Sequence, residues 1–436
     1  MIIDFSVKNF RSLKEENLFT MRADSSTSKS DNTFTVKLKD DNEIRLLKTS
    51  VVYGANGSGK SNFIKSLYAL KWLITNSMDF KVGEGIDCYE PFELDVNAKN
   101  DSVLYSITFI LNKVKYDYQV AVKENYIESE ILDYYPKGSS ANLFKRFGKK
   151  NNNNEDFVEV SLGKNLIDKR ISKKVFDNQL YLSKFGSDTP HEQLTEIYKY
   201  FKDFEVWNAL DSRDVNKLSK EISKKIANPS NIKFNNRLSK LIRIADTKIE
   251  KLSAKELKKN DFNLPEEIPD DIKNRFFEDN KLRTFAIHKL YDDKKEVGFT
   301  EFDLNKKESR GTKVLFALGG IILEALENGG VVVFDELDNS LHPKLCKFLI
   351  RLFNNSISNP NNAQLIFATH EVTLLDKDVF RKDQIWFTEK DKYGETELFS
   401  ARDVEGLRDN TNFELWYRTG KFGGNPKIKE VEFIFE

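Results

Sequence analysis

The chain has 436 residues, of which 39% are hydrophobic and 32% charged, and this composition is expected to fold into about two or three structural units rather than stay disordered. The 69 Lys and Arg residues balance 69 Asp and Glu residues, so net charge gives no reason to expect a general nucleic-acid binder.

Cysteine usage and the apolar segments exclude two further classes of protein. Cys88 and Cys346 are the only cysteines and lie far apart, which excludes a disulfide framework and suits a reducing compartment. Asp4 interrupts the apolar core that a signal peptide would need. Residues 314–326, the most apolar long segment, include Glu324 and are too short to span a bilayer of about 30 Å. We therefore expect a cytoplasmic protein without membrane insertion.

The first elements are a strand and a glycine-rich loop that leads into a helix. Residues 3–7 alternate apolar and polar side chains, which predicts a half-buried strand. A β-branched run at 51–53 precedes Gly-Ala-Asn-Gly-Ser-Gly-Lys-Ser at 54–61, and an apolar pattern of helical period follows. Strand, loop and helix are the context that the phosphate-binding pattern G-x-x-x-x-G-K-[ST] requires. The alternative is a glycine-rich turn that binds nothing.

In a loop of this kind the backbone N–H groups and the helix N-terminus face phosphate oxygens. We expect Lys60 to contact the β- and γ-phosphates and Ser61 to ligate Mg²⁺. The other loop residues predicted to contact the nucleotide are Asn56, Gly57, Ser58 and Gly59.

The next segments predict a sheet beside this core and then a helical region. Residues 103–110 and 114–122 read as two strands joined by a tight turn, with the alternation of an antiparallel sheet that has one wet face. From about 192 to 280 the apolar residues recur with a helical period, which is clearest at positions such as Leu241 and Leu252. Residues 201–260 hold 15 Lys and Arg against 8 Asp and Glu, which indicates either solvated helix faces or a surface for nucleic acid or a partner.

The C-terminal third contains two buried strands that end in polar residues. Ser309-Arg310-Gly311-Thr312 precedes an apolar helix over 313–327, which stops at Gly329-Gly330. Residues 331–334 are an apolar run that ends in Asp335-Glu336, and 364–368 are a second run that ends in Thr369-His370. Such runs are typical of central parallel strands. A last strand is expected at 385–388, with a hairpin partner near Leu398.

Each of these later features has an ordinary structural alternative when it is taken alone. The two carboxylates can cap a helix, His370 can be a satisfied strand-end histidine, and Ser309 with Gly311 can be part of a plain loop. Their order after a phosphate loop, however, is that of a nucleotide-hydrolysing site.

This set of motifs resembles an ATPase of the ABC superfamily, in the SMC-like branch that is sometimes grouped with AAA-family ATPases. The resemblance implies an α/β fold: an ABC-type P-loop NTPase core with an antiparallel β side sheet and an inserted helical subdomain. It also implies an N-terminal lobe over residues 1–190, the helical subdomain over 191–295 and a C-terminal lobe over 296–436. The implied cofactors are ATP and Mg²⁺.

The resemblance assigns roles to individual residues. Asp335 resembles the Walker B aspartate that holds Mg²⁺ through water, and Glu336 the base that deprotonates the attacking water. His370 stands where that family places a histidine on the γ-phosphate.

Further nucleotide contacts are implied outside the two Walker motifs. Ser309 and Gly311 resemble the signature segment that closes the site of a second subunit, and Asp338 an aspartate that crosses the dimer interface. Arg11 resembles a basic residue that SMC-like ATPases place on the nucleotide. A homodimer or higher homo-oligomer follows from the signature role. We identify no Q-loop glutamine.

Within that branch, the chain resembles the ATPases of bacterial phage-defence and abortive-infection systems, of the AbiLi-like and RloA-like kind. The motifs that carry this resemblance are Asn-Phe-Arg-Ser at 9–12, Glu-Ser-Arg-Gly-Thr at 308–312, Leu-His-Pro at 341–343 and Trp-Tyr at 416–417 with Gly-Lys-Phe-Gly-Gly at 420–424. It implies a sensor or regulatory subunit that controls a separate effector, often a Toprim- or HNH-type nuclease, with DNA or a phage-derived molecule as trigger. The alternatives are an SMC-like DNA-repair or DNA-binding ATPase and a nucleotide-dependent scaffold.

A nuclease domain within this chain is not expected. Asp376 and Asp378 form an Asp-x-Asp pair of the type that Toprim nucleases use for metal. The residues from 371 onward are too few for that fold in addition to the closing strands, so we interpret the pair as a solvated loop. The helical region favours the defence ATPase over a repair ATPase, because prolines at 229, 265 and 269 break it and it lacks sustained heptads.

Overall fold

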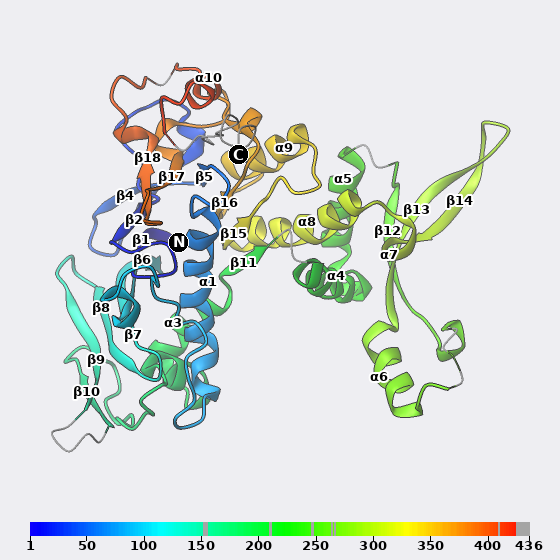
Figure 1. The fold of residues 1–436 in the computed structure, drawn as a ribbon. Coiled ribbons are helices and arrows are strands. Elements are labelled where there is room, and N and C mark those ends of the chain that lie inside the picture. Colours follow the sequence, from blue (N-terminus) through cyan, green and yellow to red (C-terminus); the bar gives the residue numbers. More distant parts are fainter. Residues whose placement is uncertain are drawn as a thin grey trace, which may run out of the picture. The chain divides into compact units, whose positions relative to one another are not determined.

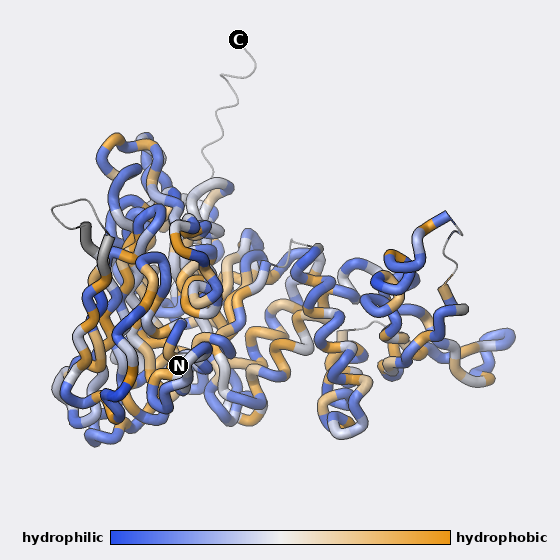
Figure 2. Tube along the Cα trace, turned by 90° about the horizontal axis from the view of Figure 1, so that it is seen from below, coloured by the Kyte–Doolittle hydropathy of each residue, from blue (hydrophilic) through white to orange (hydrophobic). Residues whose placement is uncertain are grey.

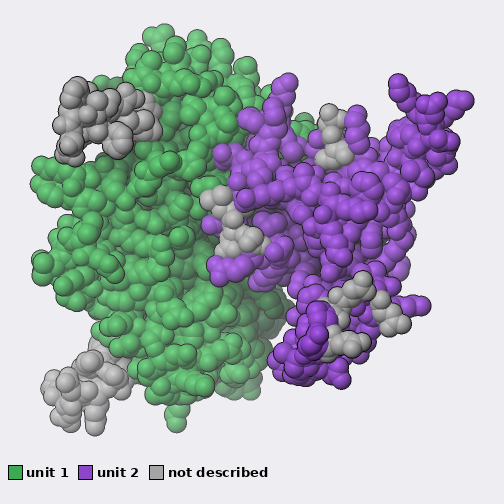
Figure 3. Space-filling view, turned by 45° about the vertical axis from the view of Figure 1, so that its right-hand side comes forward, with its two compact units in different colours: residues 1–206, 328–336, 347–436 green, residues 207–327, 337–346 purple. Residues whose placement is uncertain are grey.

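The computed structural model describes residues 1–150, 156–208, 212–245, 248–262, 265, 267–408 and 410–423. Gly424 of the C-terminal motif lies outside the described residues. The chain forms two compact units, one of residues 1–206, 328–336 and 347–436 and the other of residues 207–327 and 337–346 (Figure 3). The bounds of the second unit differ from those of the helical subdomain expected at 191–295.

The first unit contains a seven-stranded sheet in the order β10-β9-β8-β7-β6-β1-β2, in which the paired strands are antiparallel (Figure 1). Its strands are β1 (Ile2–Lys8), β2 (Asn17–Thr20), β6 (Val103–Leu111), β7 (Val114–Val122), β8 (Ile127–Tyr135), β9 (Ala141–Lys150) and β10 (Asp156–Leu162). Asn112 and Lys113, which join β6 to β7, have φ of 51° and 62°, as a two-residue hairpin turn requires. The predicted antiparallel side sheet is confirmed.

A second sheet has the order β11-β15-β16-β5-β17-β18. Its strands are β5 (Thr49–Gly54), β11 (Glu205–Asn208), β15 (Val331–Asp335), β16 (Gln364–Ala368), β17 (Ile385–Lys390) and β18 (Thr396–Ser400). Strands β15, β16, β5 and β17 run parallel to one another, whereas β18 returns antiparallel to β17. Every residue of β5, β15 and β16 is buried, which confirms the predicted central strands.

Helix α1 (Lys60–Asn76) connects the two sheets in one core. Phe63 on α1 contacts Phe5 of β1 and Phe19 of β2, at ring-centroid distances of 6.1 and 5.2 Å. The same helix also contacts β15 and β16 of the parallel sheet. Figure 2 shows apolar residues running through these strands, with polar residues in the outer loops. The core therefore fixes the start of α1, and with it the glycine-rich loop.

Other elements complete the first unit. They are the hairpin of β3 (Thr33–Lys37) and β4 (Glu43–Leu47), the helices α2 (Tyr181–Ser183), α3 (Glu192–Lys202) and α10 (Phe413–Arg418), and residues 347–354 of α9 (Pro343–Asn354). No helix in the described ranges has both the length and the apolar character needed to cross a membrane.

The second unit combines helices with a three-stranded sheet in the order β12-β13-β14. Its elements are α4 (Ser212–Ala227), α5 (Ile232–Ile244), β12 (Lys251–Glu256), α6 (Asp270–Asn280), β13 (Leu282–Asp292), β14 (Lys295–Asp303), α7 (Leu304–Lys307) and α8 (Arg310–Asn328). A Cβ on Gly319 of α8 would lie 2.7 Å from the Leu241 side chain of α5, and one on Gly320 would lie 2.4 Å from Ile222 of α4. These two glycines let α8 pack closely on both helices.

The helical pattern predicted through Leu252 ends earlier in the structure. Helix α5 stops at Ile244, and Leu252 lies on β12, where it is fully buried. Strand β12 buries a single large apolar residue, and the end of a helix can show the same sparse apolar pattern. The spacing of apolar residues therefore did not distinguish a strand from a helix here.

Candidate functional site

The predicted phosphate loop lies between the end of β5 and the start of α1. Gly57 and Gly59 have φ of 74° and 114°, the left-handed region that glycine adopts readily. The buried Lys60 Nζ donates hydrogen bonds to the carbonyl oxygens of Gly54 at 2.7 Å and Ala55 at 3.0 Å. The loop therefore curls around the ammonium group of its own lysine.

Two threonines of the β17–β18 hairpin support this loop. Ser58 Oγ lies 2.6 Å from Thr388 Oγ1, and Thr396 Oγ1 donates to the Ser58 carbonyl oxygen at 2.8 Å. Thr396 Oγ1 also lies 2.8 Å from Ser12 Oγ, which accepts a hydrogen bond from Asn62 Nδ2 at 2.7 Å. The Ser58 side chain thus supports the loop through its contact with Thr388. The phosphate-loop motif alone does not predict this role.

We expect Gly59→Ala to abolish nucleotide binding and to destabilise the fold by about 1–3 kcal/mol. A Cβ on Gly59 would lie 2.4 Å from Thr396 Oγ1 and 2.5 Å from its methyl group, in a left-handed backbone. Gly57→Ala is the matched control, because its Cβ would meet nothing within 4 Å and only the left-handed φ is strained. Binding of a fluorescent ATP analogue and thermal unfolding compare the two variants. Equal losses would show that backbone strain, and not the contact with Thr396, makes Gly59 necessary.

The strand-end carboxylates and the histidine meet beside the loop. Asp335 is buried at the end of β15, and its carboxylate is hydrogen-bonded to the Ser61 hydroxyl, while its Oδ1 has no hydrogen-bond partner among the described residues. Burial raises the pKa of Asp335, and the hydroxyl of Ser61 with the charges of Lys65, Lys60 and His370 opposes that rise. The structure thus brings together Asp335, Ser61 and Lys60, which lie far apart in the sequence.

Glu336 and His370 face each other, with Glu336 Oε1 3.3 Å from His370 Nε2. Glu336 has a φ of 57°, an uncommon conformation for a non-glycine residue, at the point where the chain leaves β15. Strained backbone of this kind clusters at functional sites, because surrounding structure must hold it. The turn directs the Glu336 carboxylate toward His370, at the end of the neighbouring strand β16.

The donors present fit Mg²⁺. Mg²⁺ prefers oxygen ligands, and in nucleotide sites it takes one or two from protein and the rest from phosphates and water. Asp335 and Ser61 supply one carboxylate and one hydroxyl, and the unpartnered Oδ1 of Asp335 is available as an acceptor. No group of three or more His, Cys, Asp or Glu that could enclose a metal ion occurs in the part of the chain that the structure describes.

The predicted signature residues belong to the second unit. Ser309 Oγ accepts a hydrogen bond from the Thr312 backbone N–H at 3.1 Å, at the start of α8. A Cβ on Gly311 would lie 2.7 Å from the Ser340 carbonyl oxygen, so Gly311 packs tightly on the loop that follows the strand-end carboxylates. The same loop carries Asp338, whose buried Oδ1 has no hydrogen-bond partner among the described residues. The signature helix and the Asp338 loop are thereby held together.

Arg11 is engaged by a carboxylate within the first unit. Its Nη2 donates to Glu90 Oε1 at 2.8 Å, its Nε contacts Glu90 Oε2, and its backbone N–H donates to the Glu90 carbonyl oxygen at 2.7 Å. A nucleotide contact of Arg11 stays a prediction.

The Asp-x-Asp pair and the C-terminal aromatic motif each contact other parts of the first unit. Asp376 accepts hydrogen bonds from Lys347 Nζ at 2.8 Å and from the Asp378 backbone N–H at 2.8 Å, as expected for a capped loop. Tyr417 and Phe422 of the C-terminal motif stack on Phe387 of β17, with centroids 5.7 and 4.6 Å away. That motif covers an aromatic face of the parallel sheet.

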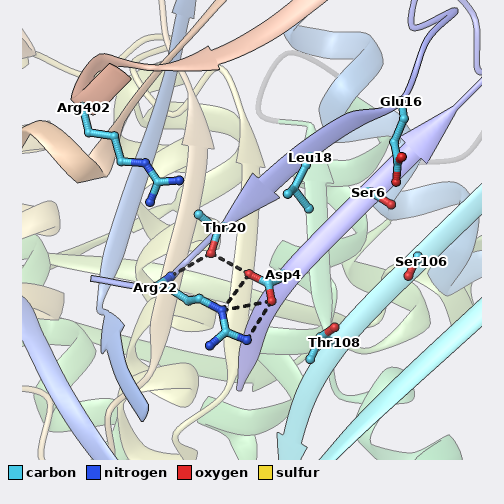
Figure 4. A pocket seen from close by; sticks show the side chains of 9 residues that line it. All are labelled: Asp4, Ser6, Glu16, Leu18, Thr20, Arg22, Ser106, Thr108 and Arg402. Carbon is cyan, nitrogen blue, oxygen red and sulfur yellow. Dashed lines mark hydrogen bonds and ion pairs between the residues drawn. The ribbon is translucent and has the colours of Figure 1, made fainter. Parts of the chain in front are cut away.

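An open pocket of about 410 Å³ lies on β1, β2 and β6, away from these residues (Figure 4). Within it, Asp4 accepts hydrogen bonds from Thr20 Oγ1 at 2.6 Å and from Arg22 Nη2 at 3.0 Å. Asp4 and Arg22 thus pair with each other, and none of the predicted site residues lines the pocket.

Comparison with known proteins places most of the chain in a family. A family model described as "AAA domain, putative AbiEii toxin, Type IV TA system" matches residues 50–376. The chain belongs to this AAA-domain family. The matched span of this AAA domain runs from the phosphate loop through His370.

A solved structure, the SMC head domain from Thermotoga maritima, is similar at 12% identity with a TM-score of 0.39, and the match covers 92% of this chain and 98% of that chain. The search of curated proteins found no match. The predicted α/β fold is confirmed: it has a mainly parallel core sheet with the glycine-rich loop and an antiparallel side sheet, and it contains an AAA domain.

Proposed function

We propose that this AAA-domain protein binds ATP with Mg²⁺ and hydrolyses it to ADP and phosphate. The observation that carries the proposal is the meeting of Asp335, Glu336 and His370 at the phosphate loop. Phosphoryl transfer needs charge neutralised on the phosphates and a water held in line, with little covalent help from the protein.

The residues divide these tasks. Lys60 and the loop N–H groups would bind the phosphate oxygens, and Asp335 with Ser61 would hold Mg²⁺. Bound Mg²⁺ would neutralise charge that develops on the β- and γ-phosphate oxygens. Glu336 accepts the proton of the attacking water, and His370 orients Glu336 from 3.3 Å away. Steady-state phosphate release with ATP and Mg²⁺ tests the proposal, and absence of turnover at any protein concentration would contradict it.

We further propose that hydrolysis takes place in a head-to-tail homodimer. The N-terminal end of α8 and the Ser309 hydroxyl present backbone and side-chain groups that suit an anion. In this layout the γ-phosphate bound by one copy contacts Ser309 and Gly311 of the other, and Asp338 lies at the shared interface. ADP lacks that phosphate.

ATP is therefore expected to shift the Glu336→Gln protein from monomer to dimer, whereas ADP is not. Sedimentation velocity with ATP, with ADP and without nucleotide measures the shift. Ser309→Arg places a bulky cation at the signature and is expected to prevent both the dimer and turnover while leaving ATP binding unchanged. Wild-type hydrolysis by Ser309→Arg would contradict the role of the signature in trans.

The biological role that we propose is that of a sensor or regulatory subunit of an antiphage system of the AbiLi-like or RloA-like kind, which controls a separate effector. The name of the matched family, which refers to a toxin of a toxin–antitoxin system, supports a role in growth control or defence. Phage plating on cells that carry this gene with its neighbours tests the role, with Lys60→Ala as the inactive control. Protection that survives Lys60→Ala would favour the scaffold alternative, and sensitivity to DNA damage without a plating effect would favour the repair ATPase.

A further inference from the structure

Two side-chain pairs fix the segment that joins β14 to α8 onto strand β13. This connector, residues 303–309, contains α7 and contacts β13 (Figure 1). At its start Asp303 lies 3.5 Å from Arg283, and near its end Glu308 lies 2.8 Å from His288. All four side chains are at most 16% exposed. Polar pairs that are shielded from water are stronger than exposed ones and fix the orientation of both partners.

The part of the connector between these two pairs is also held. Asp303 Oδ1 caps α7, because it accepts hydrogen bonds from the Asn305 and Lys306 backbone N–H groups at 2.9 and 3.2 Å. Leu304 is 1% exposed. From the start of α8, Lys313 Nζ donates to the Asn305 carbonyl oxygen at 2.5 Å. The connector therefore joins β13 to the first turn of α8 through fixed contacts.

Glu308 is the residue directly before the predicted signature serine. Its backbone is extended, with φ of −87° and ψ of 156°. Successive side chains of an extended chain point to opposite sides. Glu308 points inward to His288, whereas Ser309 is exposed and its carbonyl oxygen accepts the Lys313 backbone N–H of α8 at 3.1 Å. The direction of Glu308 thus sets the direction in which Ser309 enters α8.

The His288 ring is itself held in one orientation. An ionised carboxylate only accepts hydrogen bonds, so Nε2 of His288 is the atom that donates to Glu308. Phe302 of the neighbouring strand contacts the His288 ring at a centroid distance of 4.8 Å, and the Lys307 ammonium lies 4.8 Å from the Phe302 ring centroid. The ring is therefore packed on one side while its Nε2 holds the connector.

We propose that His288 is a positioning residue for the signature segment. By holding Glu308, it aims Ser309 and the start of α8 at the γ-phosphate bound by a second copy. The inference rests on the head-to-tail dimer proposed above, and it gives strand β13 a task in closing that site without touching the nucleotide.

A series of variants at one strand position tests the hydrogen bond. His288→Asn is expected to lower turnover at least about tenfold, because small displacements of positioning groups cost rate steeply. ATP affinity is expected to stay unchanged, since the phosphate loop belongs to the other unit. His288→Gln is expected to recover most of the turnover, because its longer amide can donate to Glu308 as Nε2 does. Lys289→Gln is the matched control, as it removes only an exposed pair with Glu296 on the same sheet.

Phosphate release, equilibrium binding of a labelled ATP analogue and thermal unfolding compare these variants. Wild-type turnover of a folded His288→Asn protein would overturn the proposal. An equal loss in the Asn and Gln variants would overturn it too, because the donated hydrogen bond would then not be what matters.

Mixing two defective chains shows whether the defect lies in the signature. His288→Asn protein is combined with an excess of Glu336→Gln protein before ATP is added. The mixed dimer has one complete site, in which the phosphate loop and base of the His288→Asn chain face the intact signature of the Glu336→Gln chain. Turnover per His288→Asn chain is therefore expected to rise toward the wild-type value, although neither protein is active alone.

Ser309→Ala, which removes the signature hydroxyl without adding bulk, is the reference in the same mixture. If Glu336→Gln restored Ser309→Ala but not His288→Asn, the histidine would act elsewhere and this inference would be wrong while the proposed dimer stood. If it restored neither, the role of the signature in trans would be wrong, and the inference would fail with it.

Discussion

Glu336→Gln is expected to bind ATP with unchanged affinity and to hydrolyse it at least about a hundredfold more slowly, the usual effect of removing a positioned general base. The amide keeps the size of the carboxylate and its position 3.3 Å from His370 Nε2, but it cannot accept a proton from water. Single-turnover phosphate release and equilibrium binding of a labelled ATP analogue separate the two effects.

A matched control for this variant lies at the end of the neighbouring strand. Glu371 follows His370, and its Oε1 accepts hydrogen bonds from the Thr373 backbone N–H and hydroxyl at 2.9 and 2.7 Å. Glu371→Gln therefore removes a nearby charge without removing the proposed base, and we expect nearly wild-type turnover. If Glu336→Gln turned over normally, the base would have to be assigned elsewhere, and His370→Ala would be the next variant to test.

The candidate residues that the structure brings together are those with a strong local pattern in the sequence. The order of strand, glycine-rich loop and helix predicted the roles of Lys60 and Ser61. The two apolar runs that end abruptly in polar residues predicted those of Asp335 and His370. Parallel strands bring their carboxyl ends to one edge of the sheet, so these three short patterns were enough to predict that the residues lie together.

Contacts between distant residues carried no local pattern and were missed. Thr388 supports Ser58 across 330 residues, and Thr396 reaches Ser12 across 384. Threonine is common in strands for its branched shape, so nothing in the sequence distinguishes these two from others. The left-handed backbone conformation of Glu336 was not predicted either, because in a sequence it is glycine that indicates this conformation.

The three-stranded sheet was hidden for a different reason. Strand β12 reads Lys-Leu-Ser-Ala-Lys-Glu, with a single large apolar residue, and both faces of the β13–β14 ribbon carry apolar side chains. Alternation is clear only where one face is buried and the other is wet.

Lys60→Ala is expected to abolish tight ATP binding and, with it, turnover and ATP-dependent assembly. Lys60 is the buried cation of the loop, 2.7 Å from the Gly54 carbonyl oxygen, and no other side chain of the loop carries positive charge. A charge-assisted contact to phosphate is worth more than a neutral hydrogen bond, so alanine leaves the loop N–H groups to hold the nucleotide alone.

The matched control is Lys65→Ala, which removes an exposed lysine from the next turn of the same helix. Lys65 stands outside the phosphate-loop motif, and we expect its replacement to leave affinity within about threefold, as for an exposed charge. Isothermal titration with a nonhydrolysable ATP analogue and Mg²⁺ compares both variants with the wild type, and thermal unfolding without nucleotide verifies that each is folded. A folded Lys60→Ala protein with wild-type affinity would contradict the assignment of the glycine-rich loop as the nucleotide site. The roles proposed for Ser61, Asp335 and Glu336 would then lose their basis too, because each depends on a phosphate held beside Lys60.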